Sequence, residues 1–186
     1  MTFKISILGS TRGSNLFALY QLLEHTDIKI IDIISNQLHS GILEKAKLLN
    51  LSFCYFPSNH FEEKLNEQLE KNKIDLLVLM GFMKILSPKF VSCWRNKIIN
   101  VHPSLLPKYA GLMDLSVHQS VLNAKEKESG CSVHYVIETV DSGDVIIQKK
   151  CNVFESDTVE TLKIRVQKLE VHALFEAIIK ISENKK

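Results

Sequence analysis

Asp75-Leu76-Leu77-Val78-Leu79-Met80 is an almost uninterrupted apolar run that ends at Gly81. A run without a polar face is typical of a central strand in a parallel sheet, where both faces are buried. Shorter apolar runs predict four more strands, at residues 3–8, 28–34, 51–56 and 97–101. Segments with helical spacing lie between the runs, at residues 16–23, 41–49 and 61–73, and a short helix follows Ser87-Pro88. This alternation predicts parallel strands that are joined by helices.

The C-terminal half departs from the alternation. After a predicted helix at 114–124, residues 131–137 alternate in polarity and contain β-branched side chains, and residues 145–148 form a second apolar run. A short acidic loop separates the two, which favours an antiparallel, hairpin-like pair. The sequence therefore predicts an α/β fold. It is a single-domain, Rossmann-like open twisted sheet over residues 1–186, mostly parallel, with an antiparallel pair in its C-terminal half and helices on both faces.

The last helix is predicted to begin at Asp157, because Glu160 stands three residues further on, as in a capping box. Its helical spacing predicts a buried stripe made of Val159, Leu162, Val166, Leu169, Ala173 and Ile178. Glu170 flanks this stripe, so we expect its side chain to be partly covered.

The composition is that of an ordinary globular protein, with 45% apolar residues and a net charge of +2. The near-neutral charge disfavours a nucleic-acid partner, and no apolar run is long enough to span a membrane. The four cysteines are far apart, and no secretory signal is visible, so we expect free thiols and a cytoplasmic location. His118, His134 and His172 lack converging acidic or thiol partners in the sequence; we interpret them as structural or surface residues and expect no metal.

Asn100 and His102 stand two residues apart at the end of a predicted strand, followed by Pro103. In an extended segment they point to the same side, and proline disfavours a helical conformation at the residue before it. An amide beside an imidazole suits a reaction in which a carbonyl oxygen becomes an oxyanion. The alternative is that both side chains only satisfy hydrogen bonds of a proline-stiffened loop.

Asp141 lies in the Gly-containing loop between the two C-terminal strands. If this carboxylate meets His102, it would stabilise the imidazolium and raise its pKa, and it could accept a proton through water from an attacking amine. The alternative is an ordinary turn residue.

Two loops of the N-terminal half are candidate binding segments. Gly13-Ser14-Asn15 follows the first predicted strand and precedes a helix, where helix amides favour a phosphate; Ser14 or Asn15 could instead act as an N-cap. The apolar segment Met83–Leu86 follows the central strand and could wall a flat aromatic ligand, or pack on the core.

Several separated motifs together resemble the phosphoribosylglycinamide formyltransferases, a branch of the folate-dependent formyltransferase family. The motifs are G-S-N-L at 13–16, G-F-M-K-I-L at 81–86, N-V-H-P-S-L-L-P-K-Y at 100–109, S-V-H-Y-V at 132–136 and V-D-S-G-D at 140–144. The resemblance implies transfer of the formyl group of 10-formyltetrahydrofolate to the amine of phosphoribosylglycinamide in purine (IMP) biosynthesis. The folate is a cosubstrate, and neither a bound cofactor nor a metal is implied.

The resemblance also implies roles for individual residues. The catalytic residues are Asn100, His102 and Asp141. The ribonucleotide-binding residues are Gly13, Ser14, Asn15, Gln167 and Glu170. The folate-binding residues are Met83, Lys84, Ile85, Leu86, Asn100, Ile137, Val140 and Asp141. Residues 1 to about 100 would form the nucleotide side, and residues from about 100 to 186 would complete the folate site and the sheet.

Three departures from the family pattern stand out. Ser58-Asn59-His60 occupy the place where an arginine often meets the folate's glutamate tail, which leaves Lys64 as a candidate. The segment from Ala110 to Gly130 is a few residues longer than usual. Arg12 stands where a small polar residue is frequent, and its charge could assist phosphate binding.

Other activities remain open at this point. A related N-formyltransferase that acts on an amino-sugar nucleotide is the main alternative. A formyltransferase for initiator tRNA normally carries a further C-terminal domain, and a non-catalytic binding domain would have no use for Asn100, His102 and Asp141 together. The partners expected are small molecules, with a monomer or a homodimer both possible.

Overall fold

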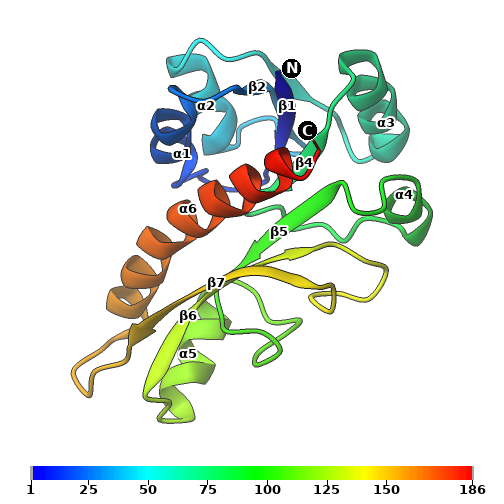
Figure 1. Ribbon diagram of the computed structural model, residues 1–186. Coiled ribbons are helices and arrows are strands. Elements are labelled where there is room, and N and C mark those ends of the chain that lie inside the picture. Colours follow the sequence, from blue (N-terminus) through cyan, green and yellow to red (C-terminus); the bar gives the residue numbers. More distant parts are fainter. Residues whose placement is uncertain (1, 186) are drawn as a thin grey trace. The chain divides into compact units, whose positions relative to one another are not determined.

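The computed structural model describes residues 2–185. They form two compact units, one reaching to Asn100 and the other beginning at Val101 (Figure 1).

The first five strands are all paired in parallel, and the fifth extends two residues past Asn100 into the second unit. They are β1 (Phe3–Leu8), β2 (Ile28–Ser35), β3 (Phe53–Tyr55), β4 (Leu76–Leu79) and β5 (Ile98–His102), in the order β3-β2-β1-β4-β5. The apolar run predicted to be central is β4, whose four residues are all buried between β1 and β5. Continuous burial on both faces explains why this strand has no polar residue.

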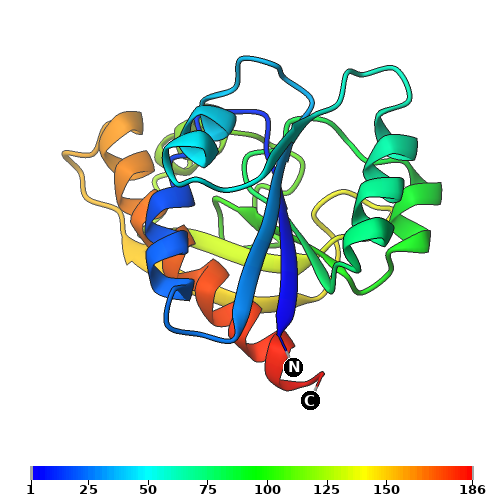
Figure 2. The same cartoon turned by 90° about the horizontal axis from the view of Figure 1, so that it is seen from above.

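Helices cover both sides of these strands. They are α1 (Leu16–Leu23), α2 (Gly41–Leu48), α3 (Phe61–Asn72) and α4 (Pro88–Cys93). Seen from above, α1 and α2 lie on one side of β1 and β2, and α3 and α4 lie on the other (Figure 2). α3 is polar overall but buries Phe61, Leu65 and Leu69, at most 1% exposed, as its helical spacing predicts.

A buried carboxylate fixes α3 to the sheet. Asp32 on β2 is 1% exposed and accepts hydrogen bonds from Gln68 and Asn72 of α3 at 2.7 and 2.8 Å. It also accepts from the hydroxyl of Ser6, its cross-strand neighbour on β1. A buried ionisable side chain is tolerated here because three donors replace the water it loses.

Replacing Asp32 by alanine should therefore destabilise the fold. The change leaves three donors without their shared acceptor, and hydrogen bonds to charged groups contribute about 1.5–3 kcal/mol each when broken singly. We expect the free energy of unfolding in urea to fall by about 3 kcal/mol. The matched control is Asp27→Ala, since Asp27 is exposed; an equal loss in both variants would contradict the assignment.

The second unit contains α5 (Leu115–Asn123), β6 (Glu128–Tyr135), β7 (Val145–Asn152) and α6 (Val159–Glu183). β6 and β7 pair antiparallel, from Glu128 opposite Asn152 to His134 opposite Val145. α6 packs along both strands and against α5 (Figure 1). The pair is longer than predicted, because Glu128-Ser129-Gly130 and Lys149–Asn152 lack the apolar pattern by which the strands were recognised.

The start of α6 was predicted wrongly. Thr158 is the N-cap, and it forms a reciprocal capping box with Thr161 in place of the Asp157–Glu160 pair. Asp157 instead accepts two hydrogen bonds from Arg165, at 2.6 and 2.7 Å. The buried stripe also shifts: Val159 and Leu169 are only half-buried, whereas Val171, Leu174 and Ala177 are buried.

The predicted α/β class is confirmed, with mostly parallel pairing, one antiparallel pair in the C-terminal half, and helices on both sides of the parallel strands. Within residues 2–185, no helix combines the length and apolar character that crossing a membrane requires.

Candidate active site

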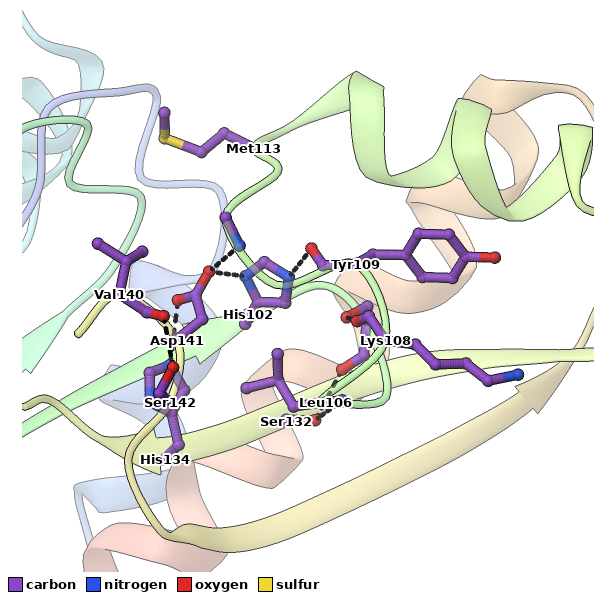
Figure 3. A network of polar contacts seen from close by, with 12 residues as sticks. His102, Leu106, Lys108, Tyr109, Met113, Ser132, His134, Val140, Asp141 and Ser142 are labelled. Carbon is purple, nitrogen blue, oxygen red and sulfur yellow. Dashed lines mark hydrogen bonds and ion pairs between the residues drawn. The ribbon is translucent and has the colours of Figure 1, made fainter.

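The end of β5 and the β6–β7 loop bring an imidazole and a carboxylate together. His102 is the last residue of β5 and is 3% exposed. Its Nδ1 lies 3.2 Å from Oδ2 of Asp141 (Figure 3). Asn100 lies two residues before His102 on the same strand, and alternate residues of a strand face the same side.

The β6–β7 loop holds Asp141 in a constrained conformation. Asp141 has a positive φ of 53°, a region that non-glycine residues adopt only when their surroundings compensate. The Gly111 amide donates to Oδ2 of Asp141 at 2.9 Å. Two residues further on, a Cβ built on Gly143 would lie 1.9 Å from the carbonyl oxygen of Tyr135, so only glycine fits against β6. The D-S-G sequence thus folds the loop back onto β6 with the carboxylate beside His102.

Gly143→Ala should move Asp141 away from His102. The added methyl group cannot be accommodated without a shift of the loop, and overpacking of this kind costs about 1–3 kcal/mol. We expect a lower melting temperature. We also expect a fall in kcat at temperatures where the variant is still fully folded, because Asp141 is displaced in the folded protein. Ser142→Ala, at an exposed neighbouring position, is the control and should behave like the unmodified chain; unchanged kcat in Gly143→Ala would contradict this account of the loop.

His134 is a second histidine at this carboxylate. It lies on β6, is 1% exposed, and places Nε2 3.4 Å from Oδ1 of Asp141 (Figure 3). Its Nδ1 lies 2.9 Å from the carbonyl oxygen of Tyr135. The sequence pattern around His134 indicates a structural or surface residue and does not reveal this contact. One sequence feature could have indicated the contact: His134 stands two residues after Ser132, so in a strand both side chains point to the same, inward face.

The electrostatics keep Asp141 ionised. Burial by itself would raise the pKa of Asp141, but the contact with His134, the Gly111 amide and the charge of His102 outweigh it and hold the pKa below its usual value. The carboxylate is therefore available at neutral pH to orient His102.

Asp141 raises the pKa of His102, as predicted, but the net shift is downward. Burial lowers the pKa of His102 below its ordinary value of 6.5. Asp141 and the Tyr109 carbonyl raise it, as expected of an anion and an acceptor, but desolvation is the larger effect. At neutral pH the buried imidazole is thus predominantly neutral, and a developing negative charge nearby is needed to favour its protonated form.

The segment after β5 covers the pair with backbone groups. The carbonyl oxygen of Tyr109 lies 3.1 Å from Nε2 of His102, on the side away from Asp141 (Figure 3). Tyr109, Gly111 and Asp114 all have positive φ, so this segment turns sharply around the pair. Because the Tyr109 carbonyl occupies the hydrogen-bonding position at Nε2, it must move before a substrate oxygen can bind there.

Serine and glutamine side chains support the S-L-L-P segment from beneath. The Ser132 hydroxyl on β6 donates to the Ser104 carbonyl at 2.7 Å and accepts from the Leu106 amide at 2.9 Å. Gln148 on β7 donates both to the Ser132 hydroxyl and to the Leu106 carbonyl, each at 2.9 Å. The backbone that follows His102 is therefore fixed to the β6–β7 pair.

In the first unit, the predicted phosphate loop connects with the apolar segment after β4. Gly13 has a φ of 59° and packs so closely on Ile42 that a Cβ would lie 2.6 Å from its side chain. Asn15 is the N-cap of α1 by position, but its side chain makes no capping hydrogen bond, and Ser14 is exposed. The Ser10 hydroxyl accepts from the Met83 amide at 3.1 Å, which links the two loops.

The apolar segment itself is only partly buried. Met83 is 44% and Ile85 68% exposed, whereas Leu86 is buried in the core. Phe82 stacks on Phe61 with ring centroids 5.6 Å apart. Exposed apolar side chains on a segment fixed by its backbone are what a wall for a flat ligand requires.

The remaining predicted residues lie in the second unit. Gln167 and Glu170 on α6 are half-buried, and Glu170 lies near Cys131 of β6. Burial raises the pKa of Cys131 to about 12, and the charge of Glu170 adds to the shift. Ile137 and Val140, on the β6–β7 loop, are 36% and 45% exposed. Among residues 2–185, no group of three His, Cys, Asp or Glu side chains is arranged to hold a metal ion.

Comparison with known proteins gives a consistent result. The family model described as formyl transferase matches residues 3–178. The phosphoribosylglycinamide formyltransferase of Haemophilus influenzae is 36% identical over 185 residues, covering 95% of this chain and 85% of that protein. The trifunctional purine biosynthetic protein adenosine-3 of Chironomus tentans is also 36% identical, over 96% of this chain, but the chain spans only 13% of that protein's length.

Solved structures show the same relationship. The phosphoribosylglycinamide formyltransferase of Anaplasma phagocytophilum is 33% identical, with a TM-score of 0.93, and the match covers 100% of this chain and 89% of that one. The enzyme of the same name from Coxiella burnetii, solved in complex with CHES, is 37% identical with a TM-score of 0.87, over 96% of this chain and 86% of that one. The chain belongs to the formyl transferase family.

Proposed function

We propose that this chain transfers the formyl group of 10-formyltetrahydrofolate to the amine of phosphoribosylglycinamide, a step of purine (IMP) biosynthesis. The observation that carries the proposal is the buried His102–Asp141 pair at the end of β5, in a chain that belongs to the formyl transferase family. The names of the relatives support the choice of acceptor.

The proposed reaction is a direct attack of the glycinamide amine on the formyl carbon. The attack converts the formyl oxygen into an oxyanion, which the Asn100 amide and the His102 imidazole stabilise by hydrogen bonds. Because burial disfavours the imidazolium, His102 becomes protonated only as negative charge develops beside it. Asp141, kept ionised by its lowered pKa, stabilises this imidazolium and assists transfer of the proton from the attacking amine, through water, to His102. The tetrahedral intermediate then collapses: the bond between the formyl carbon and N10 of the folate breaks, and N10 takes the proton from His102 as tetrahydrofolate leaves.

Binding roles follow the family pattern. The proposed ribonucleotide-binding residues are Gly13, Ser14 and Asn15 before α1, and Gln167 and Glu170 on α6. The exposed Ser14 hydroxyl supports an anion at the start of α1.

The proposed folate wall consists of Met83, Lys84, Ile85, Leu86, Ile137 and Val140, together with Asn100 and Asp141. For the glutamate tail of the folate, Lys64 at the exposed side of α3 is the proposed cation. The burial of Leu86 supports a contribution through its backbone.

The folate acts as a cosubstrate that is consumed in each turnover, so the proposal needs no resident cofactor. The proposed partners are the two small-molecule substrates, and the proposed location is the cytoplasm. Monomeric and homodimeric forms are equally compatible with the proposal.

The direct test is a comparison of two formyl acceptors. With 10-formyltetrahydrofolate as donor, kcat/KM for phosphoribosylglycinamide should exceed that for an amino-sugar nucleotide by at least about a hundredfold. A preference for the amino-sugar nucleotide would assign the chain to a different branch of the family, and no transfer to either acceptor would overturn the proposed function.

A further inference from the structure

A pocket is lined by residues 104–109, the segment that follows His102. We call it the Lys108 pocket. It has a volume of about 510 Å³ and is enclosed by residues 104–109, the end of α5 with the turn after it, the start of β6 and part of β7. All of these residues belong to the second unit. Its size falls within the range of small-molecule sites, and none of the proposed substrate-binding residues lines it.

The charge of this pocket is unbalanced. Four lysines line it, at 108, 125, 127 and 150, against two glutamates, at 126 and 128. Lys108 pairs with Glu126 at 2.8 Å, and Lys150 pairs with Glu128 at 3.0 Å. The two other lysines are exposed, and no ion pair with a carboxylate is formed by either of them within residues 2–185. Two ammonium groups are therefore left for an anion.

The rest of the lining adds an apolar surface. Leu105, Pro107 and Val121 contribute apolar side chains. The lining thus matches a molecule with an apolar body and an anionic head.

We propose that the Lys108 pocket binds a small organic anion, with a phosphate or carboxylate head at Lys125 and Lys127, and that Tyr109 transmits its binding to His102.

Tyr109 belongs to both the pocket and the candidate active site. Its hydroxyl donates to Oε1 of Glu126 at 3.1 Å, inside the pocket, and Lys108 binds the same carboxylate. Its backbone carbonyl lies on Nε2 of His102. Figure 3 shows the phenol ring and Lys108 pointing away from His102. An anion bound at Lys125 and Lys127 lies beside Glu126, between them in sequence, and repels its carboxylate. This repulsion loosens the hold of Glu126 on the phenol, and therefore the position of the carbonyl at Nε2.

The binding step is tested by NMR with three aromatic probes. Phenyl phosphate and benzoate carry the two anionic heads on the same ring, and phenol carries none. Both anions should shift the backbone amide signals of Lys127 and Ser129 saturably, and phenol should not. The stronger of the two anions identifies the head group. If neither anion gives a saturable shift, or if phenol shifts the same signals equally, the proposed site is wrong.

Two double variants distinguish binding at the pocket lysines from a general effect of the net charge of the protein. Lys125→Gln with Lys127→Gln should weaken binding of the stronger probe at least about tenfold, because two charge-assisted contacts are removed. Lys47→Gln with Lys89→Gln makes the same charge change at two exposed positions of the first unit and should leave the affinity unchanged. Equal losses in both double variants would overturn the site.

The proposed effect of pocket binding on His102 is measured separately, by the NMR signals of the His102 ring. Saturation with the stronger probe should move the ring signals of His102 in the unmodified chain. In Tyr109→Phe, which lacks the hydroxyl that reaches Glu126, the probe should still bind but the His102 signals should stay in place. An unmoved His102 in the unmodified chain, or an equal movement in Tyr109→Phe, would overturn the coupling. These measurements contain no folate or ribonucleotide, so they are independent of the proposed reaction.

Discussion

Replacing His102 by alanine is expected to lower kcat for formyl transfer by about a thousandfold, the range that a combined proton donor and oxyanion contact contributes. The affinity for phosphoribosylglycinamide should change little, because the proposed phosphate loop lies in another part of the chain. Steady-state kinetics and calorimetric titration with the ribonucleotide measure the two effects separately.

The control for this variant is His25→Ala, since His25 is exposed and has no proposed role. Near-normal turnover in His102→Ala would contradict the proposed mechanism. A loss of ribonucleotide binding equal to the loss in kcat would show that His102 serves binding instead of the chemical step.

Asp141→Asn is expected to cost about a thousandfold in kcat as well, because the amide keeps the shape of the side chain but cannot stabilise an imidazolium. The pH dependence should change in a defined direction. Asp141 raises the pKa of His102 against the lowering effect of burial, so its removal lowers the pKa of His102 further. The acidic limb of the kcat profile and the NMR titration of His102 should both move to lower pH.

Asp144→Asn provides the matched control, because Asp144 is an exposed carboxylate in the same loop. It should leave both the rate and the His102 titration unchanged. A His102 titration that moves to higher pH in Asp141→Asn would contradict the assigned electrostatics.

Much of the fold follows from short-range patterns in the sequence. The apolar run of β4 is predictable because a strand buried on both faces excludes polar residues, and α3 is predictable because Phe61, Leu65 and Leu69 recur at helical spacing. The start of β6 was not predictable in this way, because Glu128, Ser129 and Gly130 take their strand conformation from pairing with β7. Tertiary pairing overrides local preference at such positions.

The candidate site was predictable in its residue types and less so in its interactions. The sequence motifs identify His102 and Asp141 as candidates, whereas His134 lies within a regular strand pattern that does not distinguish it from a structural residue. The net pKa shift of His102 depends on burial, which a motif does not report. The contact at Nε2 comes from the backbone carbonyl of Tyr109. Because every residue has such a carbonyl, the sequence does not indicate which one contacts His102.

The central claim, direct transfer at the His102–Asp141 pair, is tested most directly by following an isotopic label. With 10-formyltetrahydrofolate labelled with ¹³C in the formyl group, the enzyme alone should acquire no label. After phosphoribosylglycinamide is added, the label should appear on the acceptor amine within one turnover, and this step should slow by about a thousandfold in His102→Ala. Label bound covalently to the protein before the acceptor is added, or transfer at an unchanged rate in the variant, would contradict the account.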